Sequence, residues 1–237
     1  MNKALSLAVA ATLSCASLNS EAQTMIGKTT DVAAIANGDR MNAETLWAMG
    51  RIGGAAASPD GKTVVYQVGY YSVKQNKSHQ MLYIMNVDGS GIKALTTDAK
   101  SETDASWIAN GTKLAFLREG EIWTMDANGE NRKKLSDTEG AIEGYKFSPD
   151  GKKVILLKSL DYHGTIKKNP SDLPLATGRL VTDMNYRHWD HYVEQISHAF
   201  VADVTENGIA NVVDILKGEP YECPLAPFGG IEQLDWS

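Results

Sequence analysis

The sequence predicts an all-β fold: a partial β-propeller of about three four-stranded blades plus the start of another. The turn sequence Ser-Pro-Asp-Gly at 58–61 recurs at 148–151, and an apolar run typical of a strand follows each copy. A weaker copy between them turns at Asn110 and Gly111. The turn glycines at 61, 111 and 151 are 50 and 40 residues apart, close to the roughly 40–50 residues of a propeller blade. A β-sandwich with coincidental turns is the alternative.

A second unit follows each of the first two turns and predicts a hairpin. Residues 82–96 and 122–136 each place an apolar run before Asp-Gly or Asn-Gly, then a shorter run. These dipeptides are the strongest short-range signal for a tight hairpin turn. Each blade therefore ends in a hairpin.

Composition limits the class of protein. The 237 residues carry a formal charge of −6 and no basic block, so we expect no nucleic-acid partner. An apolar content of 43% is ordinary for a globular protein and allows a sizeable core.

The first 22 residues resemble a secretory signal peptide. Lys3 precedes an apolar stretch of ten residues at 4–13, and Ser20-x-Ala22 is a suitable cleavage site. The stretch is too short to span a bilayer, so we expect a periplasmic or secreted protein with no membrane span. Cys15 offers a lipoprotein alternative, although residues 12–14 form a poor acylation signal. Its removal leaves Cys223 without a disulfide partner, as a small apolar side chain rather than a nucleophile.

The rest of the chain divides into a lead-in and one domain. Residues 23–51 are a lead-in that ends in a short helix. We expect Asn42 to cap this helix and Gly50 to end it, while Leu46, Trp47 and Met49 form its apolar face. Residues 52–237 form the incomplete propeller. Its third blade is interrupted at about 159–197 by an insertion that we expect to be helical, and long insertions in compact folds are usually functional.

The final residues repeat the opening of a blade. Residues 231–237 resemble 142–148, so a further Pro-Asp-Gly turn is expected where the sequence stops. Closed propellers need about four to eight blades, so we expect a fragment of a longer protein. If the chain were complete, its open strand edges would favour aggregation or a homo-oligomer.

Several segments together resemble a known family. The blades, residues 44–51, Asp-Leu-Pro at 172–174 and Tyr-Arg-His-Trp-Asp at 186–190 are similar to the N-terminal propeller of secreted prolyl oligopeptidase family serine peptidases, in particular the dipeptidyl-peptidase 5 and acylaminoacyl-peptidase type. The resemblance implies an α/β-hydrolase domain whose nucleophilic serine lies in Gly-x-Ser-x-Gly. This sequence lacks that motif, since Gly-Ser-Gly at 89–91 has the wrong spacing. We expect the catalytic domain to be missing from this chain, which alone should be inactive.

The resemblance also implies a role for the propeller. It would gate access and hold the N-terminal end of a peptide substrate from which dipeptides or acyl-residues are released. The alternative is a non-catalytic periplasmic binding propeller like TolB, because TolB-like propellers share the blade motif.

The insertion supplies candidate substrate-binding residues. Carboxylates bind the ammonium group of a peptide, and the paired N–H groups of an arginine bind a carbonyl or a carboxylate. Asp190 and Glu194 offer the first chemistry, and Arg187 offers the second. On a helix their spacing places them on one face, while Tyr186 and Trp189 supply apolar walls. A local ion pair of Arg187 with Asp190, and Trp189 as a packing anchor, are the alternatives.

A metal site in the insertion is not expected. His188 and His191 are three residues apart, and His198, Asp190 and Glu194 are near. No second tight pair of ligands completes a site, so we expect histidines that are packed or solvated, no metal and no cofactor.

Overall fold

The computed structural model describes residues 40–161, 166–167, 175, 180–181, 193–225 and 228–237. The segment 1–22 and most of the insertion lie outside this part of the chain. None of the helices among the described residues is long and apolar enough to cross a membrane.

Twelve strands form three four-stranded antiparallel sheets, each with its strands paired in chain order. The first sheet contains β1 (Arg51–Ala57), β2 (Thr63–Ser72), β3 (Lys77–Asn86) and β4 (Lys93–Ala94). The second contains β5 (Glu102–Ile108), β6 (Lys113–Arg118), β7 (Glu121–Asp126) and β8 (Lys133–Lys134). The third contains β9 (Ile142–Phe147), β10 (Lys153–Asp161), β13 (Gln195–Thr205) and β14 (Gly208–Asp214). The predicted all-β fold with three blades is confirmed.

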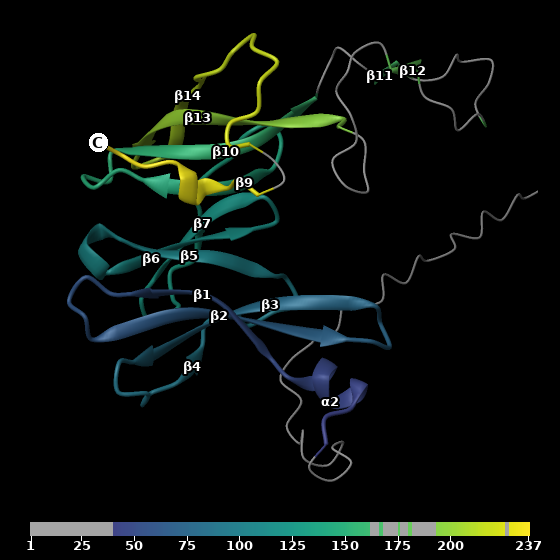
Figure 1. The fold of residues 1–237 in the computed structure, drawn as a ribbon. Helices are drawn as coiled ribbons and strands as arrows, with labels where there is room; N and C mark the ends of the chain where they lie inside the picture. Colours follow the sequence, from purple (N-terminus) through teal and green to yellow (C-terminus); the bar gives the residue numbers. More distant parts are fainter. Residues whose placement is uncertain (1–39, 162–165, 168–174, 176–179, 182–192, 226–227) are drawn as a thin grey trace, which may run out of the picture.

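The sheets lie one above another in chain order (Figure 1). Two buried apolar clusters join residues of neighbouring sheets. Strand β6 shows why, because its side chains alternate between two faces. Leu114 and Phe116 pack with Val65 and Leu82 of the first sheet. Their neighbour Ala115 instead packs toward the third sheet. Strand β6 is therefore buried on both faces, and its residues 114–117 are apolar without a gap.

The two Ser-Pro-Asp-Gly turns have the same hydrogen bonds. Asp60 Oδ1 accepts from Ser58 Oγ at 2.6 Å and from the Lys62 amide at 3.1 Å, and Gly61 takes a φ of 70°. The second copy at 148–151 gives 2.7 Å, 3.0 Å and a φ of 69° at the equivalent positions. Asp caps each turn and Gly adopts the left-handed conformation, as the sequence predicts.

The short helix α2 (Ala43–Ala48) precedes the first sheet. The Asn42 side chain accepts a 2.7 Å hydrogen bond from the Thr45 amide and so caps the helix. Its expected apolar face is not fully covered, since Leu46 and Trp47 remain 42% and 41% exposed. The helix therefore presents apolar surface beside the first sheet.

The expected opening strand of a further blade is not a strand in the structure. Ile231–Gln233 forms the 3₁₀ turn η2, and the described residues offer no ladder partner to 234–237. The segment nevertheless docks as a blade start would. Trp236 Nε1 donates to the Lys146 carbonyl at 3.0 Å, as Trp107 Nε1 donates to the Ala56 carbonyl at 3.0 Å. The hydrogen bond from a tryptophan indole to a carbonyl of the preceding blade is therefore repeated, although the strand pairing of a further blade is not formed among the described residues.

The insertion leaves the third sheet between β10 and β13. Its described part contains the two-stranded pair β11 (Ile166–Lys167) and β12 (Leu180–Val181). The helix expected over 186–194 falls almost wholly on residues outside the described part. The strands of the third sheet continue to Asp161 and resume at Gln195, so less of the range 159–197 leaves the sheet than the sequence suggests.

Candidate functional site

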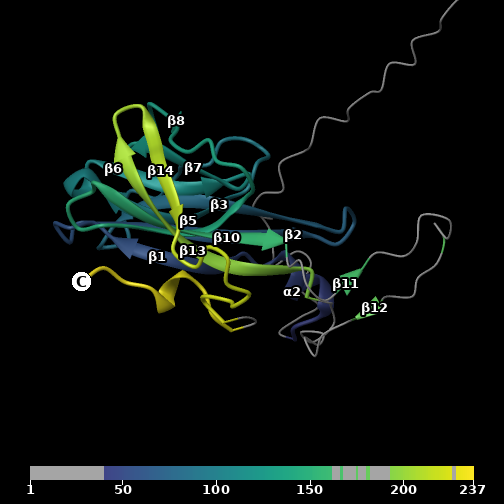
Figure 2. The same ribbon diagram turned by 90° about the horizontal axis from the view of Figure 1, so that it is seen from above.

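One end of the stack of blades carries α2, the β2–β3 connection and the β10–β13 connection (Figures 1 and 2). The turns at 58–61, 109–111 and 148–151 lie at the opposite end, where Gly111 approaches Pro59. Because successive strands run antiparallel, the β2–β3 and β10–β13 connections share the other end. We call it the insertion end. Figures 1 and 2 agree that α2 and the ends of β2 and β10 lie on this side.

Of the five substrate-binding residues predicted from the sequence, the structure places one. Glu194 is exposed, next to the start of β13 at Gln195 and hence at the insertion end. Tyr186, Arg187, Trp189 and Asp190 lie outside the described residues. Whether these five side chains converge therefore stays a prediction.

The one described histidine of the considered metal cluster is His198. It is 2% exposed on β13, and its Nδ1 lies 3.0 Å from a carboxylate oxygen of Asp214. His188 and His191 lie outside the described residues. Within the described part of the chain, no group of three side chains could hold a metal ion.

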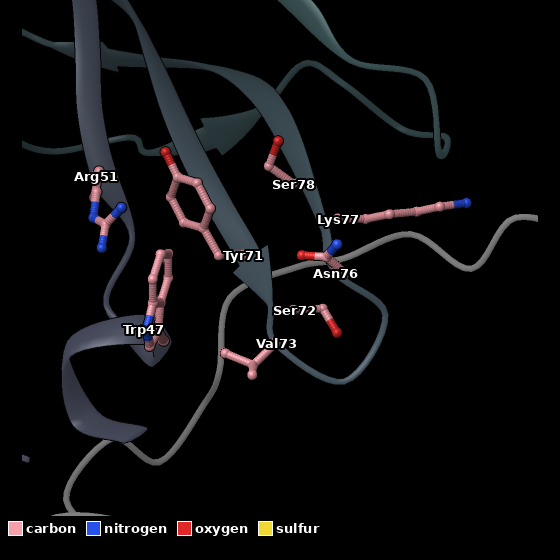
Figure 3. A pocket seen from close by; sticks show the side chains of 8 residues that line it. All are labelled: Trp47, Arg51, Tyr71, Ser72, Val73, Asn76, Lys77 and Ser78. Carbon is pink, nitrogen blue, oxygen red and sulfur yellow. The ribbon is translucent and has the colours of Figure 1, made fainter. Parts of the chain in front are cut away.

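A pocket at the insertion end was not predicted. It has a volume of about 380 Å³ and lies between α2, the start of β1 and the β2–β3 hairpin (Figure 3). Its lining comprises aromatic, cationic and small polar side chains: Trp47, Arg51, Tyr71, Ser72, Val73, Asn76, Lys77 and Ser78. Among the described residues, no acidic side chain lines it.

Two aromatic rings flank one cation in this pocket. The Arg51 Cζ atom lies 4.8 Å from the centre of the Trp47 ring and 4.4 Å from that of the Tyr71 ring. The two rings are 5.6 Å apart in an edge-to-face arrangement. Sequence reasoning missed this because helix periodicity treats Trp47 as core. The adjacent Gly50 has no room for a side chain, since a Cβ there would lie 2.8 Å from the Tyr70 ring.

A second cavity of about 230 Å³ lies along the inner strands, with lining residues from β1, β2, β3, β5, β9 and η2. Tyr145 of β9 closes one side and donates a 2.6 Å hydrogen bond to the Asp104 carbonyl of β5. Burial raises the pKa of Tyr145 well above its usual value, so the hydroxyl stays neutral. Polar groups that line this cavity hydrogen-bond one another, as Gln67 Oε1 also accepts from the Asp104 amide at 3.3 Å, which suits packing between blades better than ligand binding.

A buried ionic cluster also begins at the insertion end. Glu102, the first residue of β5, is fully buried and accepts hydrogen bonds from Thr96 Oγ1 at 2.8 Å, Arg118 Nη1 at 2.9 Å and Arg132 Nη2. Burial raises the pKa of neighbouring Asp98, but the hydrogen bonds from Arg118 and the Lys100 amide and the charge of Arg118 together outweigh it, so the pKa is lowered. All charges are paired within the cluster, so it joins the first two sheets rather than offering a free site.

Comparisons with known proteins identify the relatives of the chain. No protein-family model matches it. Dipeptidyl-peptidase 5 of Porphyromonas gingivalis is 39% identical over 204 residues, covering 84% of this chain and 30% of that protein. Dipeptidyl-peptidase 5 of Porphyromonas endodontalis is 37% identical over 191 residues, covering 79% and 28%. The chain thus spans about 30% of the length of these relatives.

A solved structure shares the fold. The acylaminoacyl peptidase of Pyrococcus horikoshii superimposes with a TM-score of 0.53 and 15% identity, over 73% of this chain and 26% of that one. The repeated blades and the extent of the sequence match lead to one conclusion. The chain belongs to the prolyl oligopeptidase family of serine peptidases, as a propeller part related in sequence to dipeptidyl-peptidase 5.

Proposed function

We propose that this chain is the substrate-gating propeller of an exported dipeptidyl peptidase and helps to hold the N-terminal end of peptide substrates. The observation that carries the proposal is the 39% identity to a dipeptidyl-peptidase 5 over 84% of the chain. A peptide substrate and an α/β-hydrolase domain are the partners that this function requires.

The insertion end supports the recognition part of the proposal. A dipeptidyl peptidase must detect a free α-ammonium group, and carboxylates bind such a group through charge-assisted hydrogen bonds. Glu194 is exposed at this end, and Asp190 is close to it in sequence. Arg187 offers a fork for a substrate carbonyl. The side chains needed to hold a peptide N-terminus are therefore concentrated in one segment.

Hydrolysis is assigned to the α/β-hydrolase domain. Acyl transfer needs nucleophile, base and oxyanion hole within hydrogen-bond reach. The sequence of this chain has no Gly-x-Ser-x-Gly elbow to supply them. The propeller would thus decide which peptides arrive, and the other domain would cleave them.

The leader sequence is the basis for proposing export. We propose that residues 1–22 direct the protein to the periplasm or the medium. Fractionating cells that express the chain with and without these residues tests this, and retention of both forms in the cytoplasm would contradict it.

A chimera tests the recognition function. This chain replaces the matching part of Porphyromonas gingivalis dipeptidyl-peptidase 5, and kcat/KM is measured with dipeptidyl chromogenic substrates that carry a free or an acetylated N-terminus. We expect Asp190→Asn to lower kcat/KM for the free amine by about tenfold or more, because a charge-assisted hydrogen bond contributes about 1.5–3 kcal/mol. The exposed Lys217→Gln is the matched control and should change little. A folded, active chimera in which Asp190→Asn, Glu194→Gln and Arg187→Gln all leave the preference unchanged would refute N-terminus recognition by this segment.

A further inference from the structure

We propose that the pocket between α2, β1 and the β2–β3 hairpin binds a carboxylate group of a peptide, with Arg51 as its principal ligand. That the ligand is a peptide rests on the proposed function. That the bound group is a carboxylate rests on the pocket itself, through the four observations that follow.

The first observation is the state of the Arg51 guanidinium. The Trp47 and Tyr71 rings lie 4.8 Å and 4.4 Å from its Cζ atom and hold it by cation–π attraction. Arg51 forms no ion pair with any carboxylate in the described part of the chain. Such contacts fix the position of the group without using its N–H donors. The paired N–H groups of the guanidinium are thus oriented in advance for a planar anion.

The second observation is the positive charge of the residues that line the pocket. Lys77 at the start of β3 is a second cationic residue of the lining, with its side chain pointing away from Arg51 (Figure 3), and no acidic side chain is among the described lining residues. This positive site stands out on a chain with a formal charge of −6. Clefts lined by one sign of charge concentrate ligands of the opposite sign.

The third observation is size. A volume of about 380 Å³ is near the lower limit of the roughly 300–1,000 Å³ usual for small-ligand pockets. It accommodates one or two residues of a peptide and excludes a folded domain.

The fourth observation is the mixed lining. Trp47, Tyr71 and the 68% exposed Val73 give an apolar wall, while Ser78 and Asn76 add small polar groups. Figure 3 shows the Trp47 and Tyr71 rings beside Arg51, with the hairpin residues across from them. An apolar side chain next to a carboxylate would fit this combination.

Two sources of a carboxylate are possible, a peptide C-terminus and an acidic side chain, and the experiment separates them. Binding of the 237-residue chain is measured by titration calorimetry with three peptides: Ac-Ala-Phe with a free C-terminus, its C-terminal amide, and Ac-Glu-Phe amide. We expect the free acid or the Glu peptide to bind about tenfold or more tightly than the plain amide, as expected for one charged hydrogen-bond pair. Whichever acid binds identifies the source.

Variants link this preference to the pocket. Arg51→Gln should abolish the difference between acid and amide, and Arg51→Lys should retain only part of it because the fork is lost. Lys74→Gln is the matched control, since it removes a charge from the same hairpin but does not line the pocket. It should leave binding unchanged.

Three results would overturn the inference: equal binding of the acids and the plain amide, no binding of any of them, or an undiminished preference for the acids in a folded Arg51→Gln protein. If melting curves show that Arg51→Gln does not fold, Arg51→Lys takes its place. An undiminished preference for the acids in the folded Arg51→Lys protein would then refute the proposal. Because the chimera reports dipeptide release, an active chimera together with failed carboxylate binding rejects this inference and leaves the proposed function intact.

Discussion

The carboxylate of Asp60 closes a turn within five residues of chain. It accepts from Ser58 Oγ and the Lys62 amide, while the Gly61 amide donates to the Ser58 carbonyl at 2.8 Å. All of these groups are local in sequence. The motif therefore forms the same turn wherever it occurs, which is why it could be recognised without knowing the fold.

The left-handed conformation of Gly61 gives a prediction. A Cβ at Gly61 meets nothing within 4 Å, so Gly61→Ala tests the φ of 70° alone and should cost about 1–2 kcal/mol of unfolding free energy. Urea denaturation measures this. Gly54→Ala is the control, because Gly54 also has free space and lacks a positive φ. Equal stability of the two variants would show that the conformation carries no penalty.

The turn carboxylates give a pH dependence. The hydrogen bond from Ser58 and then that from the Lys62 amide lower the pKa of Asp60 from 3.8, and the amide of Lys152 and then Ser148 lower that of Asp150. A lowered folded-state pKa stabilises the protein above the unfolded value, and this stability is lost as pH falls through the folded value. Melting temperature should therefore fall below about pH 4.

The double variant Asp60→Asn/Asp150→Asn isolates this effect. Its melting temperature should depend less on pH over the same range, because its turns no longer titrate. Parallel curves for the two proteins would exclude these turns as a source of the acid sensitivity.

At the scale of elements, the joint between the first two sheets depends on charges that sequence analysis did not find. Glu102 begins β5, Arg118 ends β6, and Arg132 directly precedes β8. The three residues lie at three different strands, so no period within one element links them. Only the pairing of the strands and the closing of the hairpin bring them together.

Replacing Glu102 by Gln should destabilise the protein by about 3 kcal/mol or more, because it removes the buried carboxylate that pairs with Arg132 and leaves Arg118 with Asp98 alone. Chemical denaturation of the variant tests this. Glu119→Gln, which breaks the exposed pair with Lys100, is the control and should cost less than about 1 kcal/mol. Similar losses in the two variants would contradict a special role for the buried cluster.

At the scale of the whole molecule, the exposed apolar surface suggests self-association. Several large apolar side chains are more than half exposed: Ile52, Val213, Ile215, Tyr221 and Leu225. We predict that the isolated chain associates as its concentration rises, which sedimentation velocity would detect. Tyr221→Ser/Leu225→Ser should shift it toward monomer, whereas Val87→Ser, in a hairpin turn, should not. A monomer at every concentration would refute this.

By itself the sequence determined the blade repeat, the turn and hairpin chemistry, the Asn42 cap and the family, because each depends on residues close together in the chain or on a fixed period. The tertiary structure decided what depends on neighbours. It placed Arg51 against Trp47 and Tyr71, buried Glu102 between two arginines, and left Ile231–Gln233 as a turn rather than a strand. Ring contacts, buried ion pairs and strand ladders need partners from other elements, and local sequence does not specify where those partners lie.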